Sequence, residues 1–227
     1  MSAADLAAVR LFQLASPLLP VGAYSYSQGL EAAVEAGLVR DEPTAAGWIE
    51  AVLDAGFSCF ELPVLKRLHD AWCAHDSALA AEWNNRYLVS RESAEFHAET
   101  LQMGYSLREL ARQLSAENTI SAALSAMEPV AYPTVLAWLA VHWGIPRDGL
   151  LIGHAWSWLE NQVSAALKSV PLGQAAGQRI LLHLGGRLPE QVQAACVLAD
   201  NELSNFAPGL AILSCRHETQ YSRLFRS

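Results

Sequence analysis

Apolar residues recur every three or four positions along most of the chain, which is the spacing of one face of an α-helix. The pattern begins in residues 5–15 and is clearest in 92–114, where the apolar side chains fall on one side. Valine and isoleucine are sparse and seldom alternate with polar residues, so the pattern predicts no strand. The sequence therefore predicts an all-α protein of about nine or ten packed helices, with no sheet.

Proline, glycine and polar capping residues predict where these helices begin and end. Ser25 and Gln28 have the spacing of a capping box, with Ser25 as N-cap, and Gly37 is a natural terminator of the helix that follows. Gly149 and Gly153 predict close packing against a neighbouring helix. Further helices are predicted to begin near Asp41, Pro63, Asp76, Pro146, Pro171 and Pro189, with another over 134–143. No polar linker or fixed-period repeat divides the chain, so residues 1–227 are predicted to form a single domain.

Composition excludes several classes of protein. Of the 227 residues, 52% are apolar and 17% charged, with a mean hydropathy of +0.16, which is unlike a disordered chain. The formal charge of −8 argues against a general nucleic-acid binder. The longest apolar stretch, around Val135–Trp143, is too short to span a membrane. Four cysteines form no CxxC pair, which favours free thiols in a reducing cytoplasm. We therefore expect a cytoplasmic protein that binds neither membrane nor nucleic acid.

The motifs of common enzymes and metal sites are missing from the sequence. It contains no P-loop, GxGxxG, HExxH, GxSxG or EF-hand pattern. His69, Cys73 and His75 form the nearest approach to a metal cluster, but a closed site needs four good ligands, so we expect no tightly bound metal. A helical enzyme using His154 and Glu160 is disfavoured, because residues six apart point about 120° from each other around a helix.

Three segments are richer in polar and aromatic side chains than simple connections need. The turn at 18–31 places two tyrosines beside a predicted helix N-terminus, either as a capped turn or as a place to bind a partner. Glu160, Asn161, Ser164 and Lys168 form a polar stripe, either a solvated outer face or a partner-binding face. The segment 214–227 carries three arginines and two aromatic residues, either as a frayed end or as a tail that orders on a partner.

Read together, these three segments resemble the signatures of the urease accessory protein UreF family. The first is Leu14-Ala15-Ser16-Pro17 with Leu19-Pro20-Val21-Gly22-Ala23-Tyr24-Ser25-Tyr26-Ser27-Gln28-Gly29-Leu30-Glu31. The second is 160–168 followed by Val170-Pro171-Leu172-Gly173-Gln174, and the third is the tail 214–227. The three occur in the expected order over nearly the whole chain, whereas residues 41–145 match mainly in helical character.

The resemblance implies a non-enzymatic, all-helical and dimeric maturation factor. Such a protein binds UreD (UreH in some organisms), and the pair recruits the nickel-carrying GTPase UreG to apo-urease. Nickel and GTP are then handled by the partner proteins, and this chain binds no cofactor tightly. The implied partner-binding residues are Tyr24, Ser25, Tyr26, Gln28, Glu31, Glu160, Lys168, Arg216, His217, Glu218, Tyr221, Arg223, Phe225 and Arg226.

Two further expectations depend on the tail. The first is that residues 214–227 are mobile in the free chain and fold back on the turn when UreD binds, so that Tyr24 and Tyr26 meet the tail arginines. The second is an alternative function, in which Arg216, Arg223 or Arg226 enters the active site of UreG and the protein acts as a GTPase-activating protein. A direct nickel carrier using His69, Cys73 and His75 is the least favoured reading.

Overall fold

Ten α-helices of ten or more residues account for most of the protein in the computed structural model, which describes residues 2–114 and 120–227. They are α1 Ala3–Ala15, α3 Glu42–Val52, α4 Leu62–Cys73, α5 Ser77–Val89, α6 Ala94–Leu114, α8 Tyr132–His142, α9 Arg147–Ser169, α10 Gln174–Gly185, α11 Leu188–Val197 and α12 Pro208–His217. Shorter elements are the helices α2 Leu30–Glu35 and α7 Ala122–Ala126, the 3₁₀ turn η1 Ala23–Ser25 and the π-helix η2 Leu53–Glu61. No strand occurs in the described ranges, which confirms the predicted fold class.

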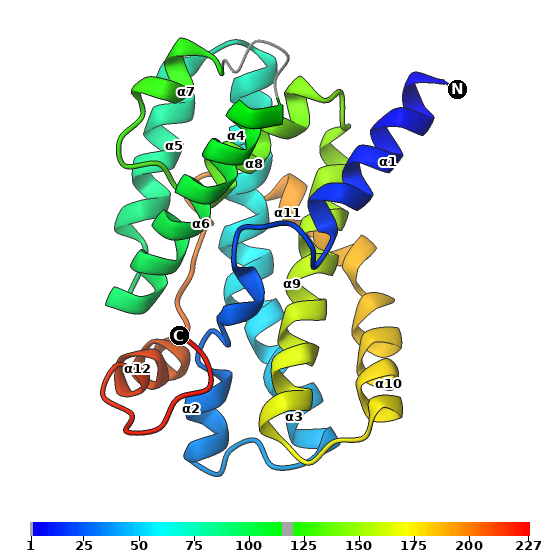
Figure 1. Ribbon diagram of the computed structural model, residues 1–227, viewed down its shortest axis with the longest axis vertical. Helices are drawn as coiled ribbons and strands as arrows, with labels where there is room; N and C mark the ends of the chain where they lie inside the picture. Colours follow the sequence, from blue (N-terminus) through cyan, green and yellow to red (C-terminus); the bar gives the residue numbers. More distant parts are fainter. Residues whose placement is uncertain (1, 115–119) are drawn as a thin grey trace.

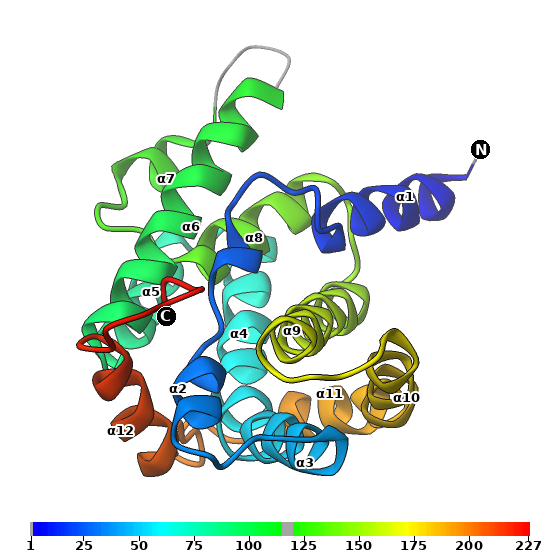
Figure 2. The same ribbon diagram turned by 60° about the horizontal axis from the view of Figure 1, so that its bottom comes forward.

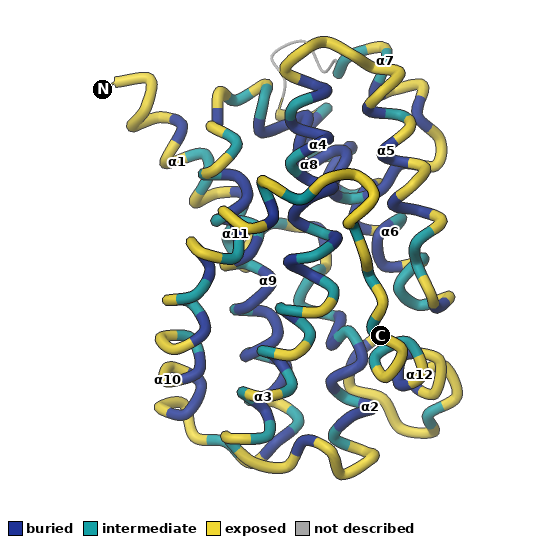
Figure 3. The backbone as a smooth tube through the Cα atoms, turned by 180° about the vertical axis from the view of Figure 1, so that it is seen from behind, coloured by how far each residue is buried: buried dark blue, intermediate teal, exposed yellow. Residues whose placement is uncertain are grey.

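Helix α9 runs through the middle of the molecule and packs against α1, α2, α3, α4, α10 and α11 (Figure 1). Its buried side includes Leu151, Leu159 and Val163. Helix α4 packs between α5 and α8, and α8 also packs on α6. Figure 3 shows that buried residues follow α4, α8 and α9, whereas α12 and the chain after it are largely exposed. Among the described helices, each is either too short or too polar to cross a lipid bilayer.

Helices α3 and α4 are joined by η2 into one continuous helical rod. The prediction that a helix begins near Pro63 is confirmed, because Pro63 lies in the first turn of α4, a position that proline favours. The wider turns of a π-helix rotate the side chains that follow, and such segments are frequent at functional sites. Here η2 turns Phe57 and Glu61 toward α9 and α5, where both line a cavity.

The predicted close approach at Gly149 and Gly153 is confirmed. Both glycines face Leu11 of α1, and a Cβ built on Gly153 would lie 2.6 Å from the Leu11 Cδ1 atom. The N-terminal half of α1 then extends away from the body of the molecule (Figure 2). The glycines therefore allow α1 to lie directly on the central helix.

Several boundaries differ from the sequence-based expectations. Helix α10 begins at Gln174 rather than near Pro171, and α7 and α12 were not predicted at all. Ser214 and His217 belong to the last turn of α12, so the polar tail begins at Glu218. Helix α12 has no side-chain N-cap. Of its neighbouring apolar residues, Ile212 is exposed and Leu213 is buried. The local signals for this helix are therefore weak, and its position depends on packing against α2 and α6.

Candidate functional site

The turn before α2 is shaped by a glycine rather than by a capping box. Gly29 has a φ of 83°, in the left-handed region that glycine adopts without steric cost, and α2 begins only at Leu30. The predicted box is therefore wrong, since Ser25 is the last residue of η1. The Ser27 hydroxyl instead accepts a hydrogen bond from the N–H of Glu31, at 3.2 Å. Spacing alone fits a cap at Ser25, but the left-handed residue delays the helix.

Gln28 is half-buried beside this glycine and points into the protein. Its φ of 53° is uncommon for a residue with a Cβ atom. The Gln28 Nε2 donates to Glu99 of α6 at 2.7 Å, and its Oε1 accepts from the Trp158 Nε1 of α9 at 2.7 Å. These two hydrogen bonds hold the strained turn against both helices.

One turn of α9 binds the chain around η1. The Tyr24 hydroxyl donates to Glu160 at 2.8 Å, and burial, helped by this bond, raises the pKa of Tyr24. The Asn161 Nδ2 donates to the Tyr26 carbonyl at 3.0 Å, and the buried Gln162 donates to the main chain beside it. The polar stripe on α9 is therefore not a solvated face, because its first residues hold the turn.

The end of the chain pairs with the same turn. The Ser27 N–H donates to the Ser227 carbonyl at 2.7 Å, and the Arg226 N–H donates to the Ser25 carbonyl at 2.8 Å. A hydrogen bond also joins the side chains of Arg226 and Tyr26, and it opposes the rise in the Tyr26 pKa that burial causes. Tyr24 meets Glu160 instead of a tail arginine, so only one of the two tyrosines has the expected partner.

Carboxylates of α2 and α6 anchor the tail. Glu31 accepts hydrogen bonds from the N–H groups of Leu224 and Phe225, at 2.7 and 2.9 Å. The buried ring of His217 lies between two carboxylates, 3.0 Å from Glu31 and 2.8 Å from Glu95. Arg223 also donates to Glu95, at 2.8 Å. Glu31 and His217, both predicted to bind a partner protein, therefore hold the tail in place.

Two remaining contacts complete the docking of the tail. The Phe225 ring is 6% exposed, and the Lys168 ammonium of α9 lies 5.5 Å from its centroid. The Glu218 carboxylate accepts from the N–H of Ala94, at 3.1 Å, where α6 begins. The turn, α9 and the tail thus form one continuous structure in the single chain, beside α2 and α12 (Figures 1 and 2).

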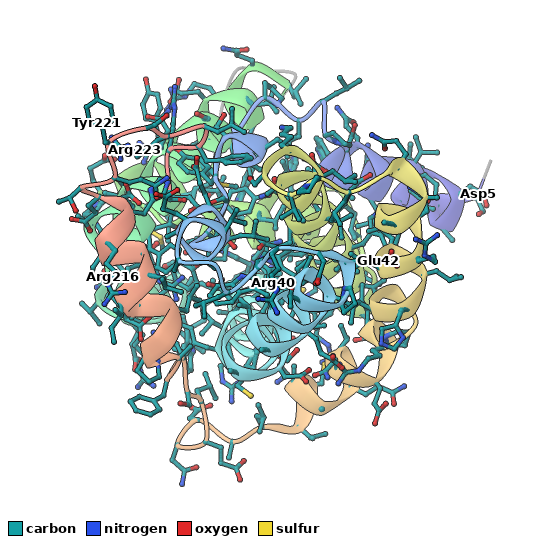
Figure 4. The ribbon with its side chains drawn as sticks, turned by 90° about the horizontal axis from the view of Figure 1, so that it is seen from below. Asp5, Arg40, Glu42, Arg216, Tyr221 and Arg223 are labelled. Carbon is teal, nitrogen blue, oxygen red and sulfur yellow. The ribbon has the colours of Figure 1, made fainter. Side chains whose placement is uncertain are left out.

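Other tail side chains are left on the surface. Tyr221 is fully exposed and Leu224 is 63% exposed. Arg216 is exposed, and in the described part of the chain its side chain has no hydrogen-bond or ion-pair partner. Figure 4 shows Arg216, Tyr221 and Arg223 on one side of the molecule, far from Asp5 of α1. We call Arg216, Tyr221, Arg223 and Leu224 the tail surface.

A cavity of about 80 Å³ lies beneath the turn, between α5, α6, α8, α9 and η2. Glu61 on one wall accepts from the Tyr87 hydroxyl and from Arg91, both at 2.6 Å. Glu99 on another wall accepts from Gln28 and, at 3.1 Å, from the Ser227 hydroxyl. The cavity therefore touches the groups that hold the turn and the tail.

Burial changes the protonation of two groups at this cavity. It raises the pKa of Glu99 to about 7, although hydrogen bonds from Gln28 and Ser227 act in the opposite direction. It lowers the pKa of His154 to about 4, so this imidazole is neutral at pH 7. The ring of His154 lies beside Phe57 and Tyr132, with centroids 5.2 and 6.0 Å away.

Sequence reasoning missed the acidic side of this site. Glu95 and Glu99 were not singled out, although a separation of four residues places them on one face of the helix predicted over 92–114. The spacing of Glu95 and Glu99 was therefore a sequence signal that could have identified them. The sequence carries no such signal for Glu61 and Arg91, because they are 30 positions apart and meet only through packing.

The histidines and cysteines do not gather around a common point. His69 Nε2 lies 3.3 Å from the Ile145 carbonyl, and Cys73 lies beside the other ring nitrogen. In residues 2–114 and 120–227, no three His, Cys, Asp or Glu side chains are placed to hold a metal ion. The expectation that the isolated chain has no tight nickel site remains a prediction, which equilibrium dialysis can test.

The fold and site define an all-helical protein whose turn, central helix and tail form a composite surface. The family model described as UreF matches residues 39–185, which is the helical body between turn and tail. The chain belongs to the UreF family. It is 52% identical over 221 residues to the urease accessory protein UreF of Dechloromonas aromatica (strain RCB), covering 96% of each chain. It is 53% identical over 222 residues to that of Azoarcus sp. (strain BH72), covering 96% of this chain and 95% of the relative.

Proposed function

We propose that this chain is a non-enzymatic urease maturation factor of the cytoplasm. In this proposal it binds UreD (UreH), and the pair recruits the GTPase UreG for insertion of nickel into apo-urease. The partner proteins handle nickel and GTP, and this chain acts as a homodimer that binds neither tightly. Membership of the UreF family supports the role, because its relatives are named urease accessory proteins.

The observation that carries the proposal is the way in which the turn and α9 hold the tail surface. Buried groups such as Glu31 and His217 anchor the segment from inside. Tyr221 and Leu224 are left facing solvent, although tyrosine and arginine are the side chains that most often dominate binding energy at protein interfaces. A tail held this firmly, with large apolar side chains turned outward, is suited to present them to a partner.

The test is recruitment of UreG by the purified complex with UreD. Deletion of residues 216–227 is expected to keep the helical circular dichroism spectrum but abolish co-elution of UreG. Tyr221→Ala is expected to weaken co-elution without a change in thermal stability, because Tyr221 makes no buried contact. Tyr105→Ala is the matched control, since Tyr105 is an exposed tyrosine in the middle of α6, beyond the residues Ala94, Glu95 and Glu99 that contact the tail. Normal UreG recruitment by both tail variants would contradict the proposal.

A second candidate function is favoured by Arg216. A GTPase-activating protein supplies an unpaired arginine to the transition state of its partner, and Arg216 has no partner among the described residues. Arg223 and Arg226 already bind Glu95 and Tyr26, so they fit that role less well. Single-turnover GTP hydrolysis by UreG in the complex distinguishes the functions. Loss of stimulation in Arg216→Ala, but not in the exposed control Arg40→Ala, would favour activation in trans.

A further inference from the structure

The cavity beneath the turn has polar atoms that no protein group satisfies. Within the described ranges, neither the Tyr132 hydroxyl, the Ser157 hydroxyl nor the His154 ring makes a hydrogen bond. All three side chains line the cavity. The three residues are only partly buried, so these atoms are open to hydrogen bonds from a ligand or from solvent in the cavity. The volume of about 80 Å³ exceeds the roughly 10–15 Å³ needed for one water molecule, so there is room for several non-hydrogen atoms.

The charges at the cavity walls are not balanced. Glu61 and Arg91 form an ion pair at 2.6 Å, and their charges offset each other. Glu99 is 7% exposed and receives hydrogen bonds only from the neutral groups of Gln28 and Ser227. An ionised carboxylate buried without a cation is costly. A cation bound beside Glu99 would offset this cost, which protonation of the carboxylate otherwise relieves.

The remaining walls suit a cation because they are aromatic. Phe57, Phe96, Tyr132 and Trp158 all line the cavity, and the indole of Trp158 stacks on Phe57 with centroids 4.6 Å apart. Aromatic faces attract ammonium groups, most strongly where water is excluded. The neutral imidazole of His154 and the free hydroxyls can accept hydrogen bonds from an N–H group.

A route to the surface is also present. A second cavity of about 60 Å³ shares Phe57, Glu61 and Trp158 with the first, and its lining continues to the exposed Glu92 and to Asn205 near α12. A small ligand can therefore reach the inner cavity beside the connection that leads into α12.

We propose that this cavity binds a small primary ammonium ion, with Glu99 as its counter-charge and the aromatic walls around its carbon atoms. The bound cation would keep Glu99 ionised, and an ionised carboxylate is the stronger acceptor for Gln28 and Ser227. Occupancy of the cavity is thereby coupled to the docking of the turn and the end of the chain. This inference is independent of which partner the tail surface binds.

The experiment titrates the full chain with methylammonium chloride and follows the indole N–H signal of Trp158 by NMR, assigned with Trp158→Phe. Sodium chloride at the same ionic strength controls for screening, and methanol controls for the methyl group without charge. A saturable shift with a Kd of about 1–10 mM is expected, because a two-atom ligand cannot bind tightly. An equal response to methanol, or none to either solute, would overturn the proposal. So would displacement of methylammonium by an equimolar amount of nickel chloride, since the site would then be a metal site.

Two comparisons establish whether Glu99 is the counter-charge. Glu99→Gln keeps the shape and is expected to weaken methylammonium binding at least tenfold, whereas Glu82→Gln, an exposed carboxylate on α5, is expected to have no effect. If Glu99→Gln does not fold, the unchanged chain still provides a test. Binding is expected to strengthen about tenfold from pH 6 to pH 8 as Glu99 ionises.

The pH comparison depends on which other groups face Glu99. They are Glu61 of η2, Tyr87 of α5, Arg91 two residues after α5, Tyr132 of α8, His154 of α9 and Tyr26 of the turn. The lowered pKa of His154 and the raised pKa values of Tyr26, Tyr87 and Tyr132 lie outside the range from 6 to 8. A binding constant that does not change over this range would contradict the role of Glu99.

Discussion

The carboxylate of Glu31 accepts a hydrogen bond from the main-chain N–H of Leu224, at 2.7 Å, although 193 positions separate the two residues. The same carboxylate also accepts from Phe225 and from the ring of His217. One side chain on the short helix α2 therefore holds both the last turn of α12 and the chain beyond it. The tail surface depends on this single acidic residue more than on any contact within the tail itself.

Glu31→Gln is expected to loosen the tail without unfolding the helices. Hydrogen bonds to a charged group contribute about 1.5–3 kcal/mol, so the amides of Leu224 and Phe225 should exchange hydrogen roughly 10–100 times faster. Glu35→Gln, an exposed position on the same helix, serves as the control. Native-state hydrogen exchange measures both variants. Unchanged protection in Glu31→Gln would mean that other contacts hold the tail.

A double-mutant cycle between Tyr26 and Arg226 is expected to give a less than additive loss of UreG recruitment. The two side chains share a hydrogen bond, so removal of either one removes the same interaction. Tyr26→Phe and Arg226→Ala should each weaken UreG binding by about 10- to 100-fold. Tyr24→Phe is the contrasting variant, because Tyr24 bonds to Glu160 and not to the tail. The loss of UreG binding in Tyr24→Phe should add to the loss in Arg226→Ala. If the losses in Tyr26→Phe and Arg226→Ala were also additive, Tyr26 and Arg226 would act separately.

The raised pKa of Glu99 predicts a pH dependence of stability. The folded protein holds this proton up to a pKa of about 7, whereas the ordinary value is 4.5. Between these values the folded state binds more protons, so the contribution of Glu99 to stability is lost as the pH rises through this window. The difference of 2.5 corresponds to about 3 kcal/mol. Urea unfolding should therefore show Glu99→Gln gaining about that much relative to the unchanged chain from pH 4.5 to pH 8.

His154 acts in the opposite direction over nearly the same range, because its pKa is lowered to about 4 from 6.5. The unfolded chain takes up this proton first, so the contribution of His154 is lost as the pH falls from 6.5 to 4. The unchanged chain should show a flatter profile than Glu99→Gln does. A profile for Glu99→Gln parallel to that of the unchanged chain would mean that folding does not raise the pKa of Glu99.

Gly153→Val is expected to destabilise the protein by about 1–3 kcal/mol, because the new side chain overpacks the contact between α1 and α9. A Cβ there meets the end of Leu11. Leu11→Ala in the same chain should recover part of the loss by making room. Thermal unfolding of the single and double variants measures both effects. Gly47→Val in α3 is the control for helix propensity, because a Cβ on Gly47 meets no atom within 4 Å. It is expected to cost less stability than Gly153→Val does.

Local sequence determined much of the helical framework. The 3.6-residue period identified α6 and α9 because their apolar side chains must all face one side. Asp41 and Asp76 were identified as N-caps because a carboxylate that accepts a main-chain N–H within three residues is a purely local interaction. Gly149 and Gly153, which have no side chain on one face of α9, likewise predicted that another helix packs closely there.

Only the tertiary structure decided which of these elements meet. The Ser25–Gln28 spacing satisfied a local rule, yet the left-handed Gly29 and the long-range hydrogen bonds of Gln28 moved the start of the helix. The pairing of Glu31 with Leu224, and of Glu99 with Ser227, depends on how α2, α6 and α12 pack together. Periodicity reports which side of a helix is buried, because neighbours three or four residues apart share that side. It carries no information about which distant group completes a buried hydrogen bond, and the tail and cavity are built from such pairs.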